Sequence, residues 1–179
     1  MKNKVKKIAI VAKAETSAAK RIVQQAIKLA KAAGLQPVTD ESTASLAELK
    51  LPIRKDPIAI SRFADLIMVI GGDGTMLHWA RTTAGSGTPI FGVNVGGLGF
   101  LTASSWKDLP KAMNAVVAGK FSIESRTLLS AIGQSCREKF KLKAMNDFVI
   151  SRGSIPRMIR LEVKVDGEVL TTYRCDGLV

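Results

Sequence analysis

Short apolar runs recur along the first half of the chain, and each is bounded by polar or glycine-rich segments. Runs of this length and composition predict strands that are buried on both faces. The clearest is Leu66–Ile70, in which five apolar residues follow one another without interruption. The predicted strands cover residues 5–11, 36–39, 66–70 and 89–95.

Apolar residues at helical spacing fill the gaps between these strands. They predict helices over residues 18–33, 76–83 and 107–117. Thr16 or Ser17 is placed to cap the first helix, and Gly34 to end it. Segment 40–61 is mixed and polar, and predicts one short helix over 44–50 and otherwise loop. Strands that alternate with helices predict an α/β fold with a mainly parallel sheet.

The pattern changes after Lys120, because no helical period interrupts the strands that follow. Asp166-Gly167 lies between two of these strands and is a strong signal for a two-residue hairpin turn. We therefore expect an α/β domain over residues 1–120 and the start of an incomplete all-β, sandwich-like domain over 121–179. The expected strands of the second part cover residues 121–133, 140–150, 158–165 and 168–174.

Composition narrows the classes of protein that fit this pattern. Of the 179 residues 46% are hydrophobic, yet no apolar run approaches the roughly 20 residues of a membrane span. We therefore expect a cytoplasmic protein with no membrane partner. The net charge of +12 favours anionic ligands, but the basic residues are scattered and aromatics are 5%, so we expect no nucleic-acid partner. Cys136 and Cys175 are too few for a disulfide framework or a zinc site.

The glycine-rich turn Gly71–Thr75 carries the first chemical signal. It follows the strand at 66–70 and opens the predicted helix, so its backbone N–H groups and the helix dipole favour a phosphate there. It is not a P-loop, because Thr75-Met76 follows Gly74 where that motif has Lys-Ser/Thr. It is not a Rossmann fingerprint either, since residues 13–17 after the first strand hold no glycine.

Asp73 is the unusual member of this turn, because a carboxylate repels a phosphate. Its position makes chemical sense if it takes a proton from an attacking hydroxyl or holds a metal ion. Aspartate is equally a preferred residue for an Asx turn or a helix cap. The residues by themselves leave both interpretations open.

Three further sites have both a functional and a structural interpretation. Phe100 follows a loop rich in glycine and is placed either to stack on a planar ligand, which we favour, or to join the core. Asn146 and Asp147 precede an apolar strand, where they form either a turn or a hydrogen-bonding pair for a diol. His78, the single histidine, follows the glycine turn; a lone histidine more often has a structural or surface role, so it is a secondary candidate and not a base.

These motifs resemble those of a known enzyme family. Gly71–Thr75 resembles the signature shared by NAD kinases, diacylglycerol and sphingosine kinases, and 6-phosphofructokinases, all of which transfer a phosphoryl group to a hydroxyl. Segments Gly92–Thr102, Asn146–Ile150 and Tyr173–Val179 resemble further blocks of the NAD kinases, in the same order. On these four blocks the chain is identified as a member of the NAD kinase family. Gly97 departs from the pattern, which more often has a larger polar residue there.

The resemblance implies a phosphotransferase that uses ATP or polyphosphate and a divalent metal such as Mg²⁺ to convert NAD to NADP. Asp73 would be the general base, and Gly74 part of the phosphate-binding turn. The protein ligands of the metal are not assigned by the resemblance. Its nucleotide-binding residues would be Asp73, Gly74, His78, Phe100, Asn146, Asp147, Arg157, Arg174 and Asp176.

Within that set the resemblance distinguishes several roles. Phe100 would contact the adenine, and Asn146 with Asp147 would bind ribose hydroxyls. Asp176 would bind the nicotinamide carboxamide, next to Arg174. Arg157 matches a family site residue only loosely and is equally consistent with a solvated surface.

Two other functions and two structural expectations accompany this assignment. A lipid kinase of the diacylglycerol type would share the Asp73 turn but lack the later blocks, and a catalytically inactive module would bind NAD without making NADP. Members of the NAD kinase family are generally homo-oligomers. We also expect the chain to be the N-terminal part of such an enzyme, weakly active or inactive alone and prone to aggregate at an open β edge.

Overall fold

The computed structural model describes residues 5–13, 17–97, 99–135, 137–154 and 156–179. The chain forms two compact units, Met1–Leu128 and Leu129–Val179, and each is described by itself. The sequence placed a boundary after residue 120, whereas the compact units divide after Leu128. The segment between the two positions contains no helix or strand, so the first unit ends in chain without regular secondary structure.

The first unit is built on one five-stranded sheet, in which every pair of neighbouring strands is parallel. The strand order is β2-β1-β3-β4-β5. This confirms the expected α/β fold with a mainly parallel sheet. The strands are β1 (Lys7–Ala12), β2 (Gln36–Val38), β3 (Leu66–Ile70), β4 (Ile90–Asn94) and β5 (Ser104–Ser105).

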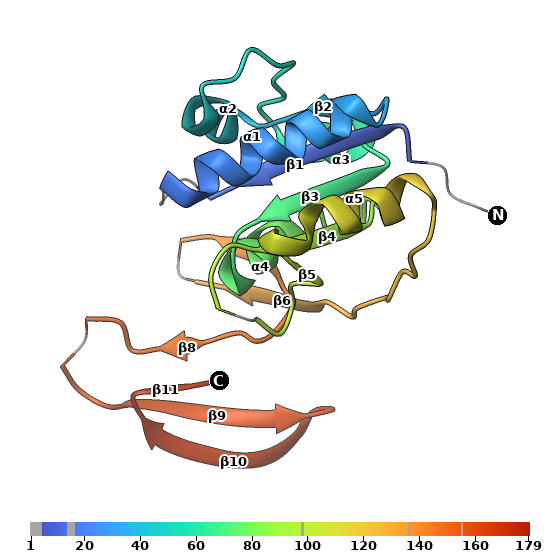
Figure 1. Ribbon diagram of the computed structural model, residues 1–179. Coiled ribbons are helices and arrows are strands. Elements are labelled where there is room, and N and C mark those ends of the chain that lie inside the picture. The colour runs from blue at the N-terminus through green and yellow to red at the C-terminus, as the bar shows by residue number, and fades with distance from the viewer. Residues whose placement is uncertain (1–4, 14–16, 98, 136, 155) are drawn as a thin grey trace. The chain divides into compact units, whose positions relative to one another are not determined.

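Helices cover both faces of this sheet, with α1 and α5 on one face and α3 and α4 on the other (Figure 1). One of them, α3, lies where the sequence predicted only loop, so that part of the prediction was wrong. Asp56 caps α3 by accepting from the Ile58 and Ala59 N–H groups, and Pro57 takes the first helical position, where its missing N–H costs nothing. The helices are α1 (Ser17–Ala32), α2 (Glu41–Ala47), α3 (Pro57–Phe63), α4 (Asp73–Thr82), the 3₁₀ helix η1 (Trp106–Asp108) and α5 (Leu109–Val117).

The first helix ends as its sequence predicts. Gly34 has a positive φ of 75°, and the Leu35 N–H reaches back to the Ala30 carbonyl at 3.0 Å. This is a Schellman closure, in which glycine adopts the left-handed conformation without a side-chain clash. At the other end, Ser17 begins the helix, and Thr16 lies outside the described residues.

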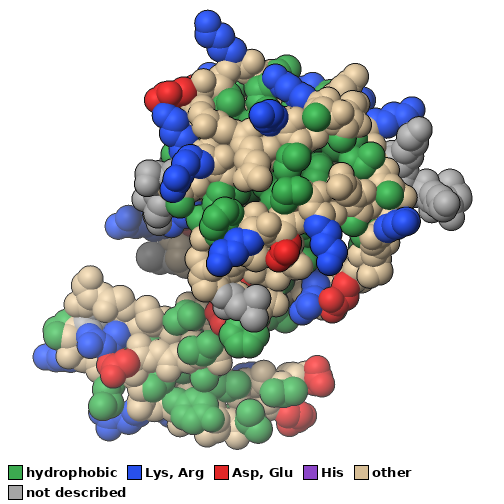
Figure 2. All heavy atoms as spheres, in the orientation of Figure 1, with side chains coloured by type: hydrophobic (Ala, Val, Ile, Leu, Met, Phe, Trp, Pro, Cys, Tyr) green, Lys and Arg blue, Asp and Glu red, His purple; other side chains and the backbone are tan. Residues whose placement is uncertain are grey.

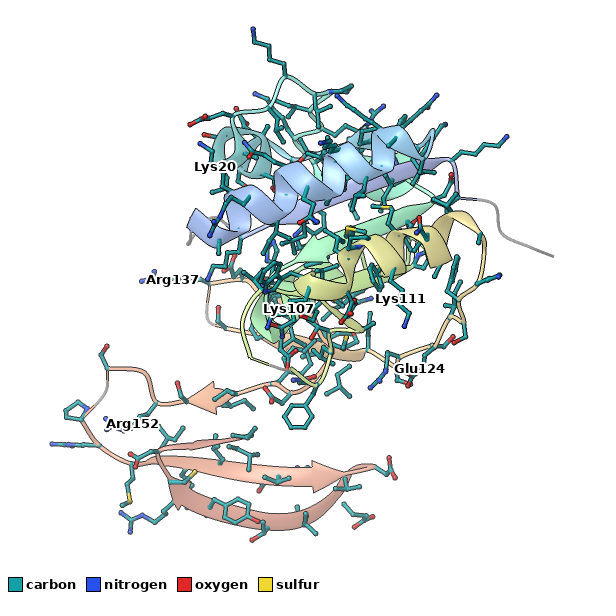
Figure 3. All side chains as sticks on the ribbon, viewed as in Figure 1. Lys20, Lys107, Lys111, Glu124, Arg137 and Arg152 are labelled. Atoms are coloured by element: carbon teal, nitrogen blue, oxygen red, sulfur yellow. The ribbon has the colours of Figure 1, made fainter. Side chains whose placement is uncertain are left out.

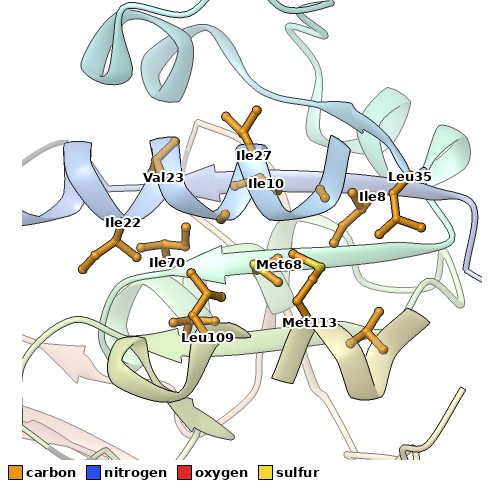
Figure 4. Close-up of a cluster of buried hydrophobic side chains, with 14 of the residues drawn as sticks. Ile8, Ile10, Ile22, Val23, Ile27, Leu35, Met68, Ile70, Leu109 and Met113 are labelled. Atoms are coloured by element: carbon orange, nitrogen blue, oxygen red, sulfur yellow. The ribbon is translucent and has the colours of Figure 1, made fainter. Parts of the chain in front are cut away.

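The core lies in two layers, one on each face of the sheet. Alternate residues of β1 divide between them, since Ile8 and Ile10 pack under α1 while Ala9 and Val11 face α3 and α4. This is the alternation that a strand imposes on its side chains. Figure 4 shows the first layer, where residues of α1, the sheet and α5 interdigitate; its labelled members include Ile22, Met68 and Met113.

The second unit consists of short antiparallel pairs, as expected for the β part. The β9 and β10 strands form a hairpin closed by Asp166 and Gly167, which have φ values of 51° and 92°. Two successive positive φ values are typical of a type I′ turn, and the two-residue hairpin that the sequence predicted is confirmed. Residues 121–128, which were expected to begin a strand, form none. The paired strands are β6 (Leu129–Gln134) with β7 (Lys139–Ala144), β8 (Ile150–Ser151) with β11 (Gly177–Leu178), and β9 (Ile159–Val165) with β10 (Glu168–Cys175).

Side chains in the second unit are far more exposed than those of the first. None of its described residues is buried, whereas the first unit has a large buried set. Figure 2 shows hydrophobic side chains at the surface over the hairpin strands, and the large exposed ones include Val169, Leu170 and Tyr173. Phe140 lies across Gly133, where a Cβ would collide with its ring. This packs an aromatic side chain over a glycine in the β6–β7 pair.

The structure also bears on the expectations about membrane spans and cysteines. Among the described residues no helix is both long and apolar enough to cross a membrane. Cys175 is a free thiol at the end of β10, and Cys136 lies outside the described residues.

Candidate functional site

The glycine turn lies at the carboxyl end of β3 and leads directly into α4. Gly71 donates its N–H to the Val93 carbonyl at 3.0 Å, which ties the turn to the end of the neighbouring β4. The Gly72 carbonyl then accepts from Thr75 and Met76, so Gly72 is the N-cap and Asp73 the first helical residue. The first N–H groups of a helix have no partner within it, so α4 presents donors at the end of β3.

Asp73 is held by a second segment of the chain rather than by its own helix. Its two carboxylate oxygens accept from the backbone N–H groups of Phe100, at 2.9 Å, and Leu101, at 3.0 Å. The sequence had left a helix cap or Asx turn open as the structural role of Asp73. The structure instead shows a carboxylate that bridges the turn after β3 and the loop after β4.

Gly99 makes this bridge sterically possible. A Cβ at this position would collide with the Asp73 carboxylate, whereas a Cβ at Gly97 would meet nothing within 4 Å. The two glycines of this loop are therefore under different steric constraints. Gly99 is required by the close approach of a side chain, and Gly97 is under no such constraint.

The base of the same loop is fastened by Asn94, the last residue of β4. Its side-chain oxygen accepts from the Gly96 N–H at 2.7 Å, and its Nδ2 donates to the Thr102 hydroxyl at 3.2 Å. Asn94 is only 4% exposed. Sequence reasoning did not select this residue, although an asparagine between an apolar strand and a glycine loop is a usable signal.

Phe100 projects from the tip of this loop and is 97% exposed. The alternative that it belongs to the core is therefore wrong. Its neighbour Leu101 packs against the layer that holds Met76 and Trp79. Leu101 therefore anchors the loop, while the ring of the adjacent Phe100 is exposed to solvent.

His78 lies one turn into α4, and its side chain is exposed. Its ring stands edge-on to that of Trp79, with the ring centroids 6.2 Å apart. In this unit the structure therefore brings Asp73 and Phe100 together through hydrogen bonds, whereas the contact that it shows for the His78 ring is with Trp79.

The remaining candidate residues belong to the second unit, and all of them are exposed. Asn146 and Asp147 follow β7 in the segment that precedes β8, while Arg157 precedes β9. Arg174, on β10, is paired in register with Arg160 on β9. Like charges directly opposite each other are unfavourable, so this pair of guanidinium groups favours an anion nearby.

Asp176 has a partner that the sequence did not reveal. Its Oδ1 accepts from the Arg152 Nε at 2.6 Å, and its backbone carbonyl accepts from the Arg152 N–H at 2.9 Å. Arg152 is labelled in Figure 3, where it follows β8. The ion pair fixes the carboxylate of Asp176 at the point where the chain passes from β10 to β11.

The donor set limits how a metal ion can be bound. Within the described ranges, no three His, Cys, Asp or Glu side chains gather as a cation site. Mg²⁺ commonly keeps most of its waters and is held by substrate phosphates with one or two carboxylates. The carboxylate of Asp73 beside the glycine turn fits that mode, and does not fit a site made of protein ligands alone.

The strand order places the first unit among the doubly wound α/β domains, and the candidate site lies where such domains bind ligands. In doubly wound α/β domains with the order 2-1-3-4-5, ligands bind beyond the carboxyl ends of the strands. Asp73, the glycine turn and the loop after β4 all lie at that edge.

Comparison with known proteins then identifies the family. Residues 8–121 match the model of the ATP-NAD kinase N-terminal domain. The chain belongs to the ATP-NAD kinase family. It is 34% identical over 176 residues to the NAD kinase of Geotalea daltonii, which covers 98% of this chain and 61% of that protein. It is 46% identical over 119 residues to the NAD kinase of Heliobacterium modesticaldum, with coverages of 66% and 42%.

Solved structures of the family have the same fold. Yeast NADH kinase complexed with NADH superposes with a TM-score of 0.83 at 24% identity, over 97% of this chain and 56% of that one. The NAD kinase from Archaeoglobus fulgidus in complex with ATP gives 0.65 at 26% identity, over 96% and 58%. The chain therefore spans roughly half of the length of these proteins.

Proposed function

We propose that this protein acts as a NAD kinase. It transfers the terminal phosphoryl group of ATP, or of polyphosphate, to the 2′-hydroxyl of the adenosine ribose of NAD, which yields NADP. Membership of the ATP-NAD kinase family supports this function, as does the similarity to a NAD kinase along 98% of the chain. The solved relatives bind NADH and ATP, the two kinds of ligand that the reaction requires.

The observation that carries the proposal is the placement of Asp73. It stands at the N-terminus of α4, beside backbone donors suited to a phosphate, and its carboxylate contacts the loop that presents Phe100. Each carboxylate oxygen has two lone pairs and uses one for a backbone N–H, so each can still accept a hydrogen bond from a substrate hydroxyl.

In this mechanism Asp73 binds the 2′-hydroxyl and takes its proton. The bond formed joins the 2′-oxygen to the terminal phosphorus, and the bond broken joins that phosphorus to its bridging oxygen. The N–H groups of the glycine turn stabilise charge on the transferred group, because preorganised donors act where charge develops. A divalent metal, if held by Asp73 and the phosphates, would neutralise the phosphate charge.

The proposal also assigns nucleotide-binding roles to residues of each unit, as the family resemblance implies. The exposed ring of Phe100 stacks on the adenine, and Gly74 and His78 lie on the phosphate side. Asn146 and Asp147 offer an amide donor and a carboxylate acceptor to ribose hydroxyls, each of which both donates and accepts. Asp176 binds the nicotinamide carboxamide, while Arg157 and Arg174 contribute positive charge to the same nucleotide. The proposal includes homo-oligomers, which rest on the family resemblance, and a cytoplasmic location, which rests on the composition of the chain.

Substitution of Asp73 by Asn tests this function. The change keeps the size of the side chain but removes its charge and its capacity to take a proton, so NADP formation should fall about 10²- to 10⁴-fold. NADP production is measured with ATP and, separately, with polyphosphate, in the intact protein. Asp108→Asn, an identical change at an exposed position, serves as the matched control.

The outcomes separate the remaining alternatives. NADP formation by Asp73→Asn at a rate close to that of the unmodified protein would exclude the role of Asp73. If the intact, unmodified protein binds NAD in calorimetry but forms no NADP, it is instead a catalytically inactive NAD-binding module. The alternative of a lipid kinase loses its support, because the family matched is that of the ATP-NAD kinases.

A further inference from the structure

The connection between β4 and β5 is unusual for two neighbouring parallel strands. Asn94 ends β4, Ser104 begins β5, and the two strands pair directly with each other in parallel. Parallel neighbours are normally joined through a helix, whereas the described residues of this connection, 95–97 and 99–103, contain none. Its shape must therefore be set by contacts other than helical hydrogen bonds.

Those contacts fall at the two ends of the loop. At its base, Asn94 bridges the outgoing chain at Gly96 and the returning chain at Thr102 with the two ends of one amide. The Ala103 N–H donates to the Gly92 carbonyl at 3.0 Å in the same place. At the tip, the Asp73 carboxylate accepts from Phe100 and Leu101.

The contact at the base of the loop is buried, so its loss costs more than the loss of a hydrogen bond in an exposed turn. Asn94 is 4% exposed, and a buried amide that loses a partner carries the cost of an unsatisfied polar group. Gly92 supports the same contact, because a Cβ there would lie 3.1 Å from the Thr102 Cα and 2.7 Å from the Met76 sulfur. The returning chain therefore packs against β4 at the position where Asn94 reaches it.

From this geometry we infer that Asn94 is a positioning residue for nucleotide binding. It closes the base of the loop so that Asp73 can engage the tip, and the two together hold the exposed Phe100 ring ready to stack on the base. The inference rests on the proposed function for the identity of the ligand. The clasp itself, Asn94 at the base and Asp73 at the tip, is a property of the protein without ligand.

The first arm of the test therefore uses no nucleotide. In Asn94→Ala, amide hydrogen exchange should accelerate about tenfold or more at Gly96, and also at Phe100 and Leu101, because the tip opens when the base is released. Asn114→Ala, the same change at an exposed position of α5, should leave these amides as in the unmodified protein. Acceleration at Gly96 alone would show that Asn94 only closes a local turn, and would overturn the inference.

Thr102→Val provides a gentler variant should Asn94→Ala fold poorly. It is nearly isosteric and removes only the hydroxyl that Nδ2 contacts, while the bond to Gly96 remains. Exchange at Phe100 and Leu101 should accelerate about threefold, in the same direction as for Asn94→Ala. Unchanged exchange at both amides would contradict the clasp.

The second arm measures the dissociation constant of NAD in a double-mutant cycle. Asn94→Ala should weaken binding about tenfold when Phe100 is present, but less than about twofold in the Phe100→Ala background, because it acts through that ring. Equal effects in both backgrounds would indicate a general structural role and overturn the inference. If the unmodified protein bound no NAD, the proposed function would fail, and the exchange arm would still decide the clasp.

Discussion

The two compact units hold their candidate residues in different ways. In Met1–Leu128 the site grows out of a sheet with a buried layer on each face, and Asp73 is fixed by two backbone N–H groups from another loop. In Leu129–Val179 the candidates lie on exposed hairpins, where Asp176 is fixed by one side-chain partner, Arg152. The candidate side chains of the first unit are therefore positioned by the core and by backbone hydrogen bonds, whereas Asp176 of the second unit is positioned by a local ion pair.

This difference teaches that the two units should respond differently to substitution. A residue of the first unit can be essential because it packs or because it positions the loop. Most exposed residues of the second unit can be substituted with little effect on folding, so a loss of function there reports on the ligand. Phe140, which packs over Gly133, is the exception. Three pairs of matched substitutions test this contrast.

The largest effect on stability is expected from a matched pair of leucines. Leu109 is fully buried at the start of α5, whereas Leu170 on β10 is 65% exposed. Leu109→Ala should lower the free energy of unfolding by about 2–5 kcal/mol, and Leu170→Ala by less than about 0.5 kcal/mol. Chemical denaturation monitored by fluorescence measures both. Similar losses for the two variants would show that the β10 surface is covered in solution, and would break the comparison.

A pair of phenylalanines separates ligand binding from folding. Phe100→Ala should weaken NAD binding by about 1–3 kcal/mol, the usual contribution of a base stacked on an aromatic ring, and leave stability nearly unchanged. Phe140→Ala should do the reverse, because that ring packs over Gly133 in the second unit. Calorimetry with NAD and thermal unfolding compare the two. An unaltered NAD affinity in Phe100→Ala would exclude stacking at this position.

The smallest effect is expected from the exposed ion pairs. Arg152 pairs with Asp176 at 2.6 Å, and Arg126 pairs with Glu124 at 3.0 Å. Replacing either arginine by alanine should cost less than about 1 kcal/mol of stability, as is usual at a surface.

The affinity for NAD distinguishes the two arginines. It should fall in Arg152→Ala, because Asp176 loses the partner that orients it, and stay the same in Arg126→Ala. Equal affinities in the two variants would contradict the role of Asp176 in the nucleotide site.

Much of the first unit could be predicted from the sequence because its signals are local. The Leu66–Ile70 strand, the helix ended by Gly34 and the glycine turn all follow from periodicity and backbone freedom. The α3 helix was missed because Pro57 suggested loop, although Asp56-Pro57 is also a good helix start. The Asp166-Gly167 turn was predicted for the same local reason as the strands, since its conformation depends on those two residues.

The contacts within the site could not be predicted in this way. Asp73 and Phe100 are far apart in the sequence, and nothing in either segment states that the carboxylate of one meets the backbone of the other. The role of Asn94 is hidden for the same reason, because Thr102 becomes its partner only when β5 returns beside β4. Arg152 and Asp176 likewise meet through the pairing of β8 with β11.

By itself the sequence determined the class of fold, most of the strands and helices of the first unit and the chemistry available at the end of β3. It also carried the motifs on which the family was identified. Only the tertiary structure decided which groups meet, that Gly99 must be a glycine while Gly97 need not be, and that Phe100 stands in solvent. The physical reason is that periodicity and turn preferences act over a few neighbouring residues, whereas a hydrogen bond across a sheet edge exists only once distant strands have paired.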